Sequence, residues 1–325
     1  MTFYDSISAI TTPPTAGQWC IGGTGYGVEA IVMPFTGSRL RRPSATPAET
    51  AALRRSGEAL QMMVESPEVV PRNDAVDSSL ASWARWINGH QLTFIAWRLA
   101  REVRDAFKAK LIGPHQAAHL LAACVDAYSR LLVYSGSCSI SDYHQIIRPA
   151  MYRHNPAFSG TWAADYAPIR DVLRMNPESM VELGPNAMLH RVLSDNRAVH
   201  EYIANRLVPD GVSLLQQAHH VPLGQSRGVR NGAYDLFFMT ARSQISGQEL
   251  LAALLRRAND LLLDVSLSAD SFERNFTDSD APPYPLQLIA GLPTSLVQLV
   301  HVGKALGWLD DVTSVQGSTA VEEKD

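Results

Sequence analysis

The stretch SSLASWARWINGHQLTFIAWRLAREVRDAF, residues 78–107, decides the fold class. Its aromatic and histidine side chains recur at spacings of three, four, four and three residues, so they share one face of a single helix. These side chains are Trp83, Trp86, His90, Phe94 and Trp97. The helical pattern continues to Lys110 and stops at Gly113-Pro114, a pair typical of a helix end. One long helix with an apolar face indicates a mainly α protein.

Helical patterns also dominate the chain on either side. Thr46, Pro47 and Glu49 form a capped helix start, and this helix is expected to reach Ser66. Further helices are expected over residues 115–134, 160–175, 186–208, 231–240, 247–264 and 285–308. Loops rather than strands should connect them, since strands and helices nowhere alternate as in a βαβ protein. The sequence therefore predicts an all-α fold, with residues 46–311 forming one helical domain.

The two ends of the chain differ from this domain. Residues 1–45 are rich in proline, with a glycine cluster IGGTGYG at 21–27 and a β-prone VEAIVM at 28–33. They predict an extended N-terminal arm or a small hairpin. The cluster is interpreted as a turn, because it lacks the lysine of a P-loop and a long preceding strand. Residues 312–325 are small and charged, and we expect them to be disordered.

Composition narrows the classes of function. The 325 residues are 46% hydrophobic and 18% charged, with a net charge of -4, which is typical of a folded globular protein without a broad positive field. A nucleic-acid partner is therefore not expected. Three cysteines without a CxxC pair predict neither a disulfide framework nor a structural zinc site. The N-terminus lacks the pattern of a signal peptide and no stretch approaches a membrane span, so we expect a cytoplasmic protein that contacts no membrane.

Two histidines stand on apolar helix faces. His90 lies at the centre of the aromatic stripe, and a buried imidazole needs a partner there. The pattern fits either a core histidine bonded to a neighbour, which it favours, or a ligand pocket with aromatic walls. His200 lies on the apolar stripe of the 186–208 helix, where a neutral imidazole would suit a haem iron. His190, ten residues earlier, sits close to the same stripe and is its rival.

Two loops carry further candidates. SDYHQIIRPAMYRHNPAFSGTWAADY, residues 141–166, contains Arg148 and Arg153 in a largely apolar setting. It is either a surface loop or a site where an arginine binds a carboxylate. HHVPLGQSRGVRNGAYD, residues 219–235, has three glycines in a polar setting. It is either a flexible loop or a lid over a site.

Taken in order along the chain, these pieces resemble the haem-dependent aromatic oxygenases, the superfamily of tryptophan 2,3-dioxygenase. In that family the distal histidine stands in a helix reading T-H-Q-x-x-E-L-W-F-K, and GHQ at 89–91 looks like its counterpart. The family's proximal histidine stands six residues before an arginine that precedes a glycine turn, as His200, Arg206 and Gly211 do here. His190 has no basic residue at that distance, which favours His200.

The resemblance covers about residues 78–240. The family's S-G-F-Q-S segment is similar to residues 159–162, and its glycine-rich closing loop is similar in place to residues 224–232. Departures are the missing glutamate and Trp-Phe-Lys of the distal helix and the missing Gln-Ser of the S-G segment. The chain looks closer to the tyrosine-hydroxylating branch, whose enzymes make L-DOPA for natural-product pathways. A sister branch acts on 3-methyl-tyrosine and attaches its haem through an HxxxC element that this sequence lacks, which favours non-covalent haem b.

The resemblance implies a helical haem-binding domain of the tryptophan 2,3-dioxygenase type that hydroxylates L-tyrosine to L-DOPA. The alternatives within the superfamily are a 3-methyl-tyrosine hydroxylase and an indole or tryptophan dioxygenase. From another class, the alternative is a non-catalytic all-α protein that binds haem or another ligand. The oxidant would be hydrogen peroxide, or dioxygen with a reductant. A homo-oligomer, either a dimer or a tetramer, is also expected from the resemblance.

The same resemblance implies a role for each candidate residue. His200 would bind the iron, and His90 would act in catalysis on the opposite face of the haem. The aromatic walls of the cofactor pocket would be Trp83, Trp86, Phe94 and Trp97. The substrate would contact Arg148 or Arg153 through its carboxylate, and also Ser159, Gln225 and Ser226.

Overall fold

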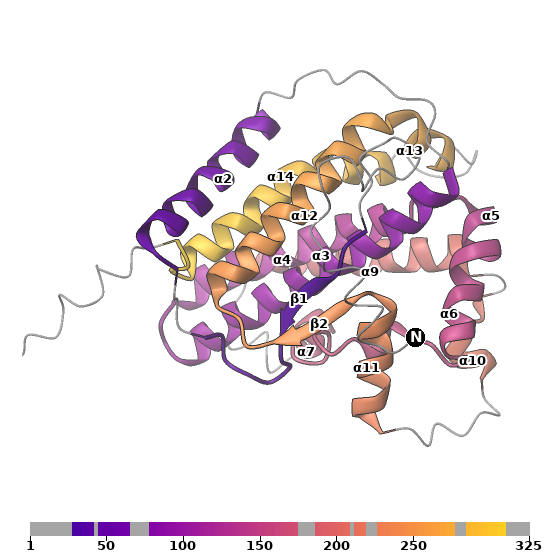
Figure 1. The fold of residues 1–325 in the computed structure, drawn as a ribbon, viewed down its shortest axis with the longest axis horizontal. Coiled ribbons are helices and arrows are strands. Elements are labelled where there is room, and N and C mark those ends of the chain that lie inside the picture. Colours follow the sequence, from indigo (N-terminus) through magenta and orange to yellow (C-terminus); the bar gives the residue numbers. More distant parts are fainter. Residues whose placement is uncertain are drawn as a thin grey trace, which may run out of the picture.

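The structure, a computed structural model, describes residues 28–41, 45–65, 78–174, 186–208, 211–218, 226–276 and 284–309 (Figure 1). Its long helices are α2 (Pro47–Glu65), α3 (Ser78–Lys108), α4 (Pro114–Ser135), α9 (Ala187–Leu207), α12 (Gly247–Leu267) and α14 (Tyr284–Ala305). Shorter helices are α5 (Ile140–Asp142), α6 (Arg148–His154), α7 (Arg170–Leu173), α10 (Leu214–Gln217), α11 (Arg227–Phe237) and α13 (Ala269–Phe276). A π-helix η1 (Tyr143–Ile147), a 3-10 turn η2 (Gly160–Trp162) and strands β1 (Ile31–Pro34) and β2 (Thr240–Ser243) complete it. The predicted mainly helical class is confirmed.

The core is a bundle around α3 and α4. Helix α4 lies between α3, α9 and α14, and α12 packs against α3 and α14 (Figure 1). The 31 residues of α3 run through the middle, and the side chains of Ile87, Leu92, Ile95 and Leu99 are fully buried there. Burial of such side chains stabilises the folded state by about 1.5–3 kcal/mol each relative to full exposure. The 78–107 stretch is therefore the central helix of the bundle.

Capping residues determine where two of the long helices begin. The Thr46 backbone N–H donates to Glu49 Oε2 at 2.7 Å, and the Glu49 N–H donates to Thr46 Oγ1 at 3.2 Å. This reciprocal pair is a capping box, which satisfies backbone donors that the first helical turn leaves unpaired. Ser246 and Glu249 form the same arrangement at the start of α12. The predicted capped start of the first helix is confirmed.

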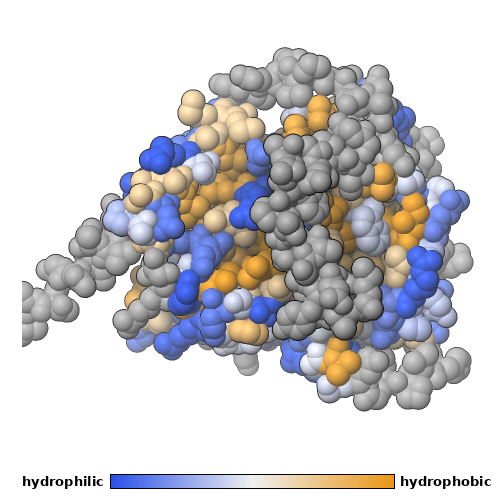
Figure 2. Space-filling view, viewed as in Figure 1, coloured by the Kyte–Doolittle hydropathy of each residue, from blue (hydrophilic) through white to orange (hydrophobic). Residues whose placement is uncertain are grey.

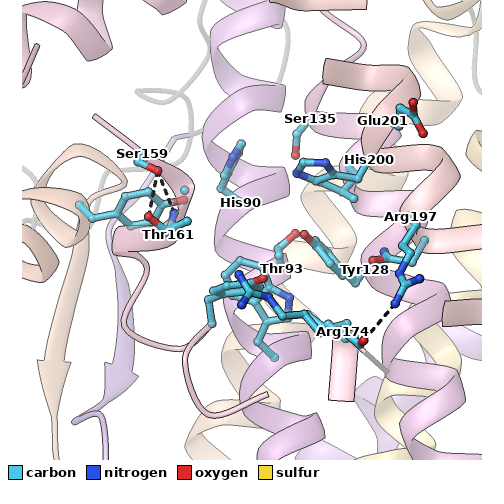
Figure 3. Close-up of a pocket in the computed structure, with 17 residues that line it drawn as sticks. His90, Thr93, Tyr128, Ser135, Ser159, Thr161, Arg174, Arg197, His200 and Glu201 are labelled. Carbon is cyan, nitrogen blue, oxygen red and sulfur yellow. Dashed lines mark hydrogen bonds between the residues drawn. The ribbon is translucent and has the colours of Figure 1, made fainter. Parts of the chain in front are cut away.

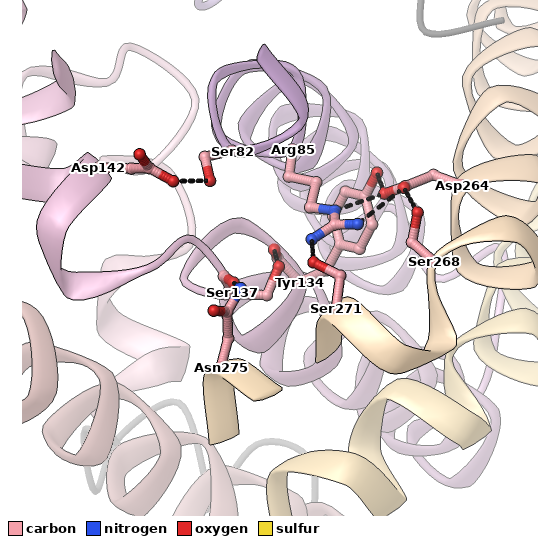
Figure 4. A network of polar contacts seen from close by, with 9 residues as sticks. All are labelled: Ser82, Arg85, Tyr134, Ser137, Asp142, Asp264, Ser268, Ser271 and Asn275. Carbon is pink, nitrogen blue, oxygen red and sulfur yellow. Dashed lines mark hydrogen bonds and ion pairs between the residues drawn. The ribbon is translucent and has the colours of Figure 1, made fainter. Parts of the chain in front are cut away.

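A buried ion pair joins the bundle helices. The Arg85 guanidinium on α3 donates to both carboxylate oxygens of Asp264 on α12, at 2.8 and 3.0 Å, and both side chains are 1% exposed (Figure 4). The hydroxyls of Tyr134 and Ser268 also donate to this carboxylate, at 2.8 and 2.9 Å. A charge pair so far from water is stable only when the remaining acceptor positions are satisfied as they are here. The pair fixes α3, α4 and α12 in one register.

The N-terminal segment pairs with a distant strand. Strand β1 lies parallel to β2, from Ile31 opposite Thr240 to Pro34 opposite Ser243. The expectation of loops rather than strands is therefore wrong at residues 240–243. The predicted extended arm does contain a strand, but its partner lies some two hundred residues away instead of in a local hairpin. Parallel strands cannot be joined by a tight turn, and their pairing is not visible as a local pattern. The expected disorder of 312–325 lies outside the described residues.

The segment after the S-G pair is also less helical than the sequence predicts. In place of one helix over residues 160–175, the structure has only the short η2 and α7 there. Pro168 lies between them and lacks the backbone N–H that a continuous helix needs. This irregular segment forms one wall of the cavity described below.

Helix α14 is apolar along most of its length. It has the length and hydropathy of a helix that could cross a membrane, which corrects the expectation that no stretch approaches a membrane span. Just over half of its apolar window is buried inside the protein, where it packs against α4, α12 and α2. A core helix of a helical bundle passes the same test of length and composition, and this burial favours that interpretation.

Some apolar side chains remain on the surface of α2. Met62 is 69% exposed and Met63 is 49% exposed. In the space-filling view, hydrophobic residues are interspersed with polar ones over the side of the molecule where α2, α12 and α14 lie (Figure 2). Scattered apolar residues are normal on a protein surface, so these do not identify a partner. The expected homo-oligomer stays a prediction.

Candidate functional site

A cavity of about 730 Å³ opens between α3, α4, α9 and the 159–174 segment (Figure 3). His90 lines it from α3 and His200 lines it from α9. The His200 imidazole points from α9 towards α3 in this view. Cavities that hold cofactors and small molecules usually measure about 300–1,000 Å³. The structure thus brings the two predicted histidines, more than one hundred residues apart in the chain, to one cavity of suitable size.

The His90 ring is held from three sides. Its Nδ1 lies 2.6 Å from the Trp86 carbonyl oxygen, one turn earlier on α3. Phe238 stacks on the ring at 4.4 Å between centroids and 18° between planes, and the Trp86 ring lies 4.6 Å away. Because a carbonyl only accepts, Nδ1 must carry the proton, and in the neutral ring Nε2 is left as an acceptor. The sequence left two interpretations of His90 open, and the structure shows features of both. The ring is bonded to a neighbour on its own helix, and it also lines a cavity.

Burial keeps the His90 imidazole neutral. Desolvation lowers its pKa from 6.5 to about 4, and the hydrogen bond to Trp86 opposes this shift only in part. Burial disfavours the charged form of an imidazole, and no carboxylate of the described residues contributes to the pKa of His90. Near neutral pH the Nε2 lone pair is thus available to accept a proton or to bind a metal.

Gln91 connects this ring to the N-terminal segment. Its side-chain amide nitrogen donates to the Glu29 carbonyl at 2.9 Å and to the Phe238 carbonyl at 3.0 Å. It thereby joins the segment that leads into β1 to the residue stacked on His90. The glutamine of the GHQ sequence therefore has a structural role at the edge of the site.

Gly89 allows α3 and α4 to lie close together beside the cavity. A Cβ atom built on Gly89 would lie 2.1 Å from Ser135 Oγ and 3.1 Å from the Tyr134 ring. Ser135 lines the cavity, and its hydroxyl donates to the Leu131 carbonyl at 2.8 Å. A larger residue here would force the side chains of Ser135 and Tyr134, or the two helices, to shift. The close approach sets the width of the cavity next to His90.

His200 is held in place from the end of its helix. Arg206 donates to the carbonyls of Gly136 at 2.8 Å, Cys138 at 3.1 Å and Asn275 at 2.7 Å. These bonds fix the C-terminal half of α9 against the turn that follows α4. The His200 side chain is exposed towards the open cavity, yet desolvation by its surroundings lowers its pKa. The rival, His190, is exposed and does not line the cavity.

The cavity also carries polar groups that the sequence patterns did not single out. Tyr128, Tyr166 and Tyr234 line it, and no hydrogen bond from their hydroxyls to another described residue is present. Desolvation raises the pKa of Tyr128 and of Tyr234, so both phenols stay protonated. Arg174 and Arg197 line it as well, and Arg197 donates to the Arg174 carbonyl at 3.0 Å (Figure 3). Tyrosines and exposed arginines are too common in helices to mark a site by pattern alone.

The predicted aromatic walls divide into two groups. Trp97 lines the cavity directly and packs edge-on against Tyr128, with ring centroids 5.2 Å apart. Trp86 and Phe94 lie behind and contact the His90 ring, whereas Trp83 packs on Phe237 further away. The aromatic stripe of α3 thus belongs mainly to the protein core. Of its five side chains, Trp97 and His90 line the cavity.

The predicted substrate contacts are only partly brought together. Ser159 lines the cavity and bonds to Thr161 at 3.0 Å between their hydroxyl oxygens. Arg148 and Arg153 do not line it, and the Arg148 guanidinium donates to the Val212 carbonyl at 2.9 Å. Ser226 caps α11 away from the cavity, and Gln225 lies outside the described residues. The arginines that the structure places at the cavity are Arg174 and Arg197 instead.

The residues present fit a haem. The cavity offers two neutral imidazoles from different helices, and aromatic side chains on its walls. Trp97 Nε1 is a buried donor that has no hydrogen-bond partner among the described residues, as expected for a group that would meet a bound molecule. Arg174 and Arg197 could bind carboxylates of such a cofactor. Among the described residues, no cluster of three or more His, Cys, Asp or Glu side chains could hold a bare metal ion.

Comparison with known proteins points in the same direction. Residues 27–187, just under half of the chain, match a family described as SfmD 3-methyl-L-tyrosine peroxygenase. No curated protein matches the chain at a significant level. The sequence resemblance favours hydroxylation of L-tyrosine with 3-methyl-tyrosine as an alternative, and the match supports the alternative better. Over residues 27–187, the chain is thus similar to the SfmD 3-methyl-L-tyrosine peroxygenase family.

Proposed function

We propose that this protein is a haem-dependent peroxygenase that hydroxylates the ring of 3-methyl-L-tyrosine. The observation that carries the proposal is the single cavity that two neutral imidazoles, His90 and His200, line from different helices. The family match supplies the substrate and the reaction type. The family match favours an enzyme over the alternative of a non-catalytic protein that binds haem or another ligand.

The reaction consumes one peroxide for each product molecule. One oxygen atom of hydrogen peroxide is inserted into a ring C–H bond beside the phenol to give a hydroxyl group, and the other oxygen leaves as water with both peroxide hydrogens. Bound haem would supply the oxygen-transfer chemistry, which no side chain can provide alone. The protein would position the ring, keep bulk water away from it and move protons.

His200 is the residue that we assign to the iron. It lies on the exposed, cavity-facing side of α9, and its lowered pKa keeps the ring nitrogen unprotonated, as a metal ligand must be. The three carbonyl contacts of Arg206 hold this part of α9 in position. Binding would be non-covalent: the described cysteines, Cys124 and Cys138, are buried, and burial raises the pKa of both thiols.

His90 is the residue that we assign to proton transfer. With Nδ1 donating to Trp86, Nε2 accepts the proton of the substrate phenol as the ring is attacked. Thr93 and Ser135 line the cavity on the same side, and their hydroxyl protons are donated to backbone carbonyls. Their oxygens therefore face the ligand as acceptors too.

Isotope labelling tests this function directly. The haem-loaded protein is incubated without dioxygen, with ¹⁸O-labelled hydrogen peroxide and equal amounts of 3-methyl-L-tyrosine, L-tyrosine and L-tryptophan. We expect 3-methyl-L-tyrosine to gain one labelled oxygen fastest. Faster labelling of L-tyrosine would show that L-tyrosine is the preferred substrate, and the protein would then be assigned as an L-tyrosine hydroxylase. In a parallel incubation with dioxygen and a reductant, a tryptophan product with two added oxygens would replace the peroxygenase assignment by a dioxygenase.

A further inference from the structure

A second, smaller pocket adjoins the main cavity. It measures about 300 Å³ and is lined by Arg170, Arg174, Arg227 and Arg230, which we call the arginine pocket. The two cavities share Thr161, Tyr166 and Arg174 as lining residues. A molecule in the main cavity can thus reach the arginine pocket past these shared side chains.

The four arginines come from two helices as two pairs. Arg227 and Arg230 are three residues apart on α11, so they lie on one face of it. Arg170 and Arg174 are four apart, and the Arg174 N–H donates to the Arg170 carbonyl at 2.9 Å, which continues the helical turn of α7. The Asn231 amide, with its nitrogen turned to Trp162, donates to the carbonyls of Trp162 and Arg227 at 3.0 and 3.1 Å. This contact joins α11 to the wall that both cavities share.

The charges in this pocket are not balanced within the described part of the chain. Asp171 lies 3.8 Å from Arg170, and both side chains are about half exposed, so their attraction is weak. No other described carboxylate lies within ion-pair distance of Arg174, Arg227 or Arg230. Like charges so close together repel one another, and an anion placed between them relieves that repulsion. The pocket is therefore selective for negative charge.

We propose that the arginine pocket binds carboxylate, and that it holds the acidic end of the molecule in the main cavity. A planar guanidinium group binds a planar carboxylate with two parallel hydrogen bonds, and the pocket offers four guanidinium groups for this. The carboxylate has two candidate sources, the amino-acid substrate and the propionates of haem. This inference rests on the proposed function for the identity of both. It also transfers the carboxylate-binding role from Arg148 and Arg153, which lie outside both cavities.

Binding experiments on the double variant Arg174→Gln/Arg230→Gln distinguish the two sources. In the first arm, the haem-loaded protein is titrated with 3-methyl-L-tyrosine and with 3-methyltyramine, which lacks only the carboxylate. In the second arm, the protein without haem is titrated with haemin, and the affinity is read from the Soret band. Arg191→Gln, which changes an exposed arginine outside both pockets, is the matched control.

If the substrate is the source, the wild-type protein prefers 3-methyl-L-tyrosine over 3-methyltyramine, and the double variant loses about tenfold or more of that preference. If haem is the source, the preference stays and the Kd for haemin rises by a similar factor. Unchanged values in both arms, with normal thermal unfolding, would overturn the proposal. So would an equal loss of preference in Arg153→Gln alone. Peroxide turnover of the wild-type protein is measured separately, so a failure of the proposed activity is not confused with these outcomes.

Discussion

The Nδ1 atom of His90 lies 2.6 Å from the carbonyl oxygen of Trp86, one turn earlier on the same helix. This contact fixes the tautomer of the imidazole, because a carbonyl can only accept. A histidine that binds a metal usually donates its second nitrogen in the same way. The geometry thus leaves the lone pair of His90 Nε2 free to accept a proton or to bind iron. The variants described below distinguish these two roles.

Removal of His200 is expected to abolish haem binding. His200→Ala should lose the Soret band after loading with haemin, because no other residue on α9 offers a ring nitrogen to the cavity. His190→Ala is the matched control: it lies on the same helix, is exposed and lies outside the cavity, so it should load normally. The measurement is haem content by absorbance per mole of folded protein.

His90→Ala should keep its haem and lose most of its turnover. Loss of a positioned proton acceptor typically reduces the rate by about 10²–10⁴-fold. The measurement is product formation per haem with 3-methyl-L-tyrosine and peroxide. If His90→Ala loses the haem and His200→Ala retains it, the two roles are exchanged.

Acid should destabilise the protein without haem partly through His90. Its pKa is about 4 in the folded state and 6.5 in the unfolded chain, so the unfolded chain takes up this proton first as the pH falls. Between these values, stability rises with pH by up to about 1.4 kcal/mol per unit from this group. Urea unfolding at several pH values should give a shallower slope for His90→Gln than for the wild-type protein or for His190→Gln. Equal slopes would contradict the buried, neutral state of His90.

Gly89→Ala should destabilise the fold by about 1–3 kcal/mol, because the added methyl group meets Ser135 Oγ at 2.1 Å. The double variant Gly89→Ala/Ser135→Ala should recover part of the loss. Gly232→Ala serves as the control. No atom of the described residues lies within 4 Å of the position that its added methyl group would take on α11, and alanine should stabilise that helix by up to about 1 kcal/mol. Thermal unfolding of all three variants provides the comparison, and equal effects at both glycines would refute the close contact.

Asp264→Asn should cost about 3–5 kcal/mol, since it removes the negative charge that Asp264 places against the buried Arg85 guanidinium. The exposed pair of Arg41 and Glu249 gives the contrast, with side chains 48% and 49% exposed. Arg41→Gln should cost less than about 1 kcal/mol. Urea denaturation of both variants measures the difference, and similar losses would mean that the buried pair does not hold the bundle together.

Local sequence pattern was sufficient to predict the long helices of the bundle, and it was insufficient for the partner of the N-terminal strand. The Thr46 helix start, the long helix from Ser78 and the span of α9 follow from capping residues and period, which act within a few residues of the chain. Strand β1 could be suspected from β-prone residues, but its parallel partner at 240–243 depends on contacts across most of the chain. The predicted helix at 160–175 is interrupted for a local reason, because Pro168 cannot donate a backbone hydrogen bond. The prediction from hydrophobic period did not take this proline into account.

For the site, the sequence by itself predicted the two helices that carry His90 and His200, because periodicity assigns side chains to helix faces. The predicted apolar stripe of α9 is shifted at one position, since Val199 is buried there and His200 is exposed beside it. The sequence could not determine which other side chains join these histidines, because that depends on how the helices cross. The tertiary structure alone brought Tyr128, Arg174 and Tyr234 to the cavity of His90 and His200, and placed Arg148 and Arg153 outside it. It also decided the tautomer and low pKa of His90, since burial and a 2.6 Å contact are properties of packing and not of spacing.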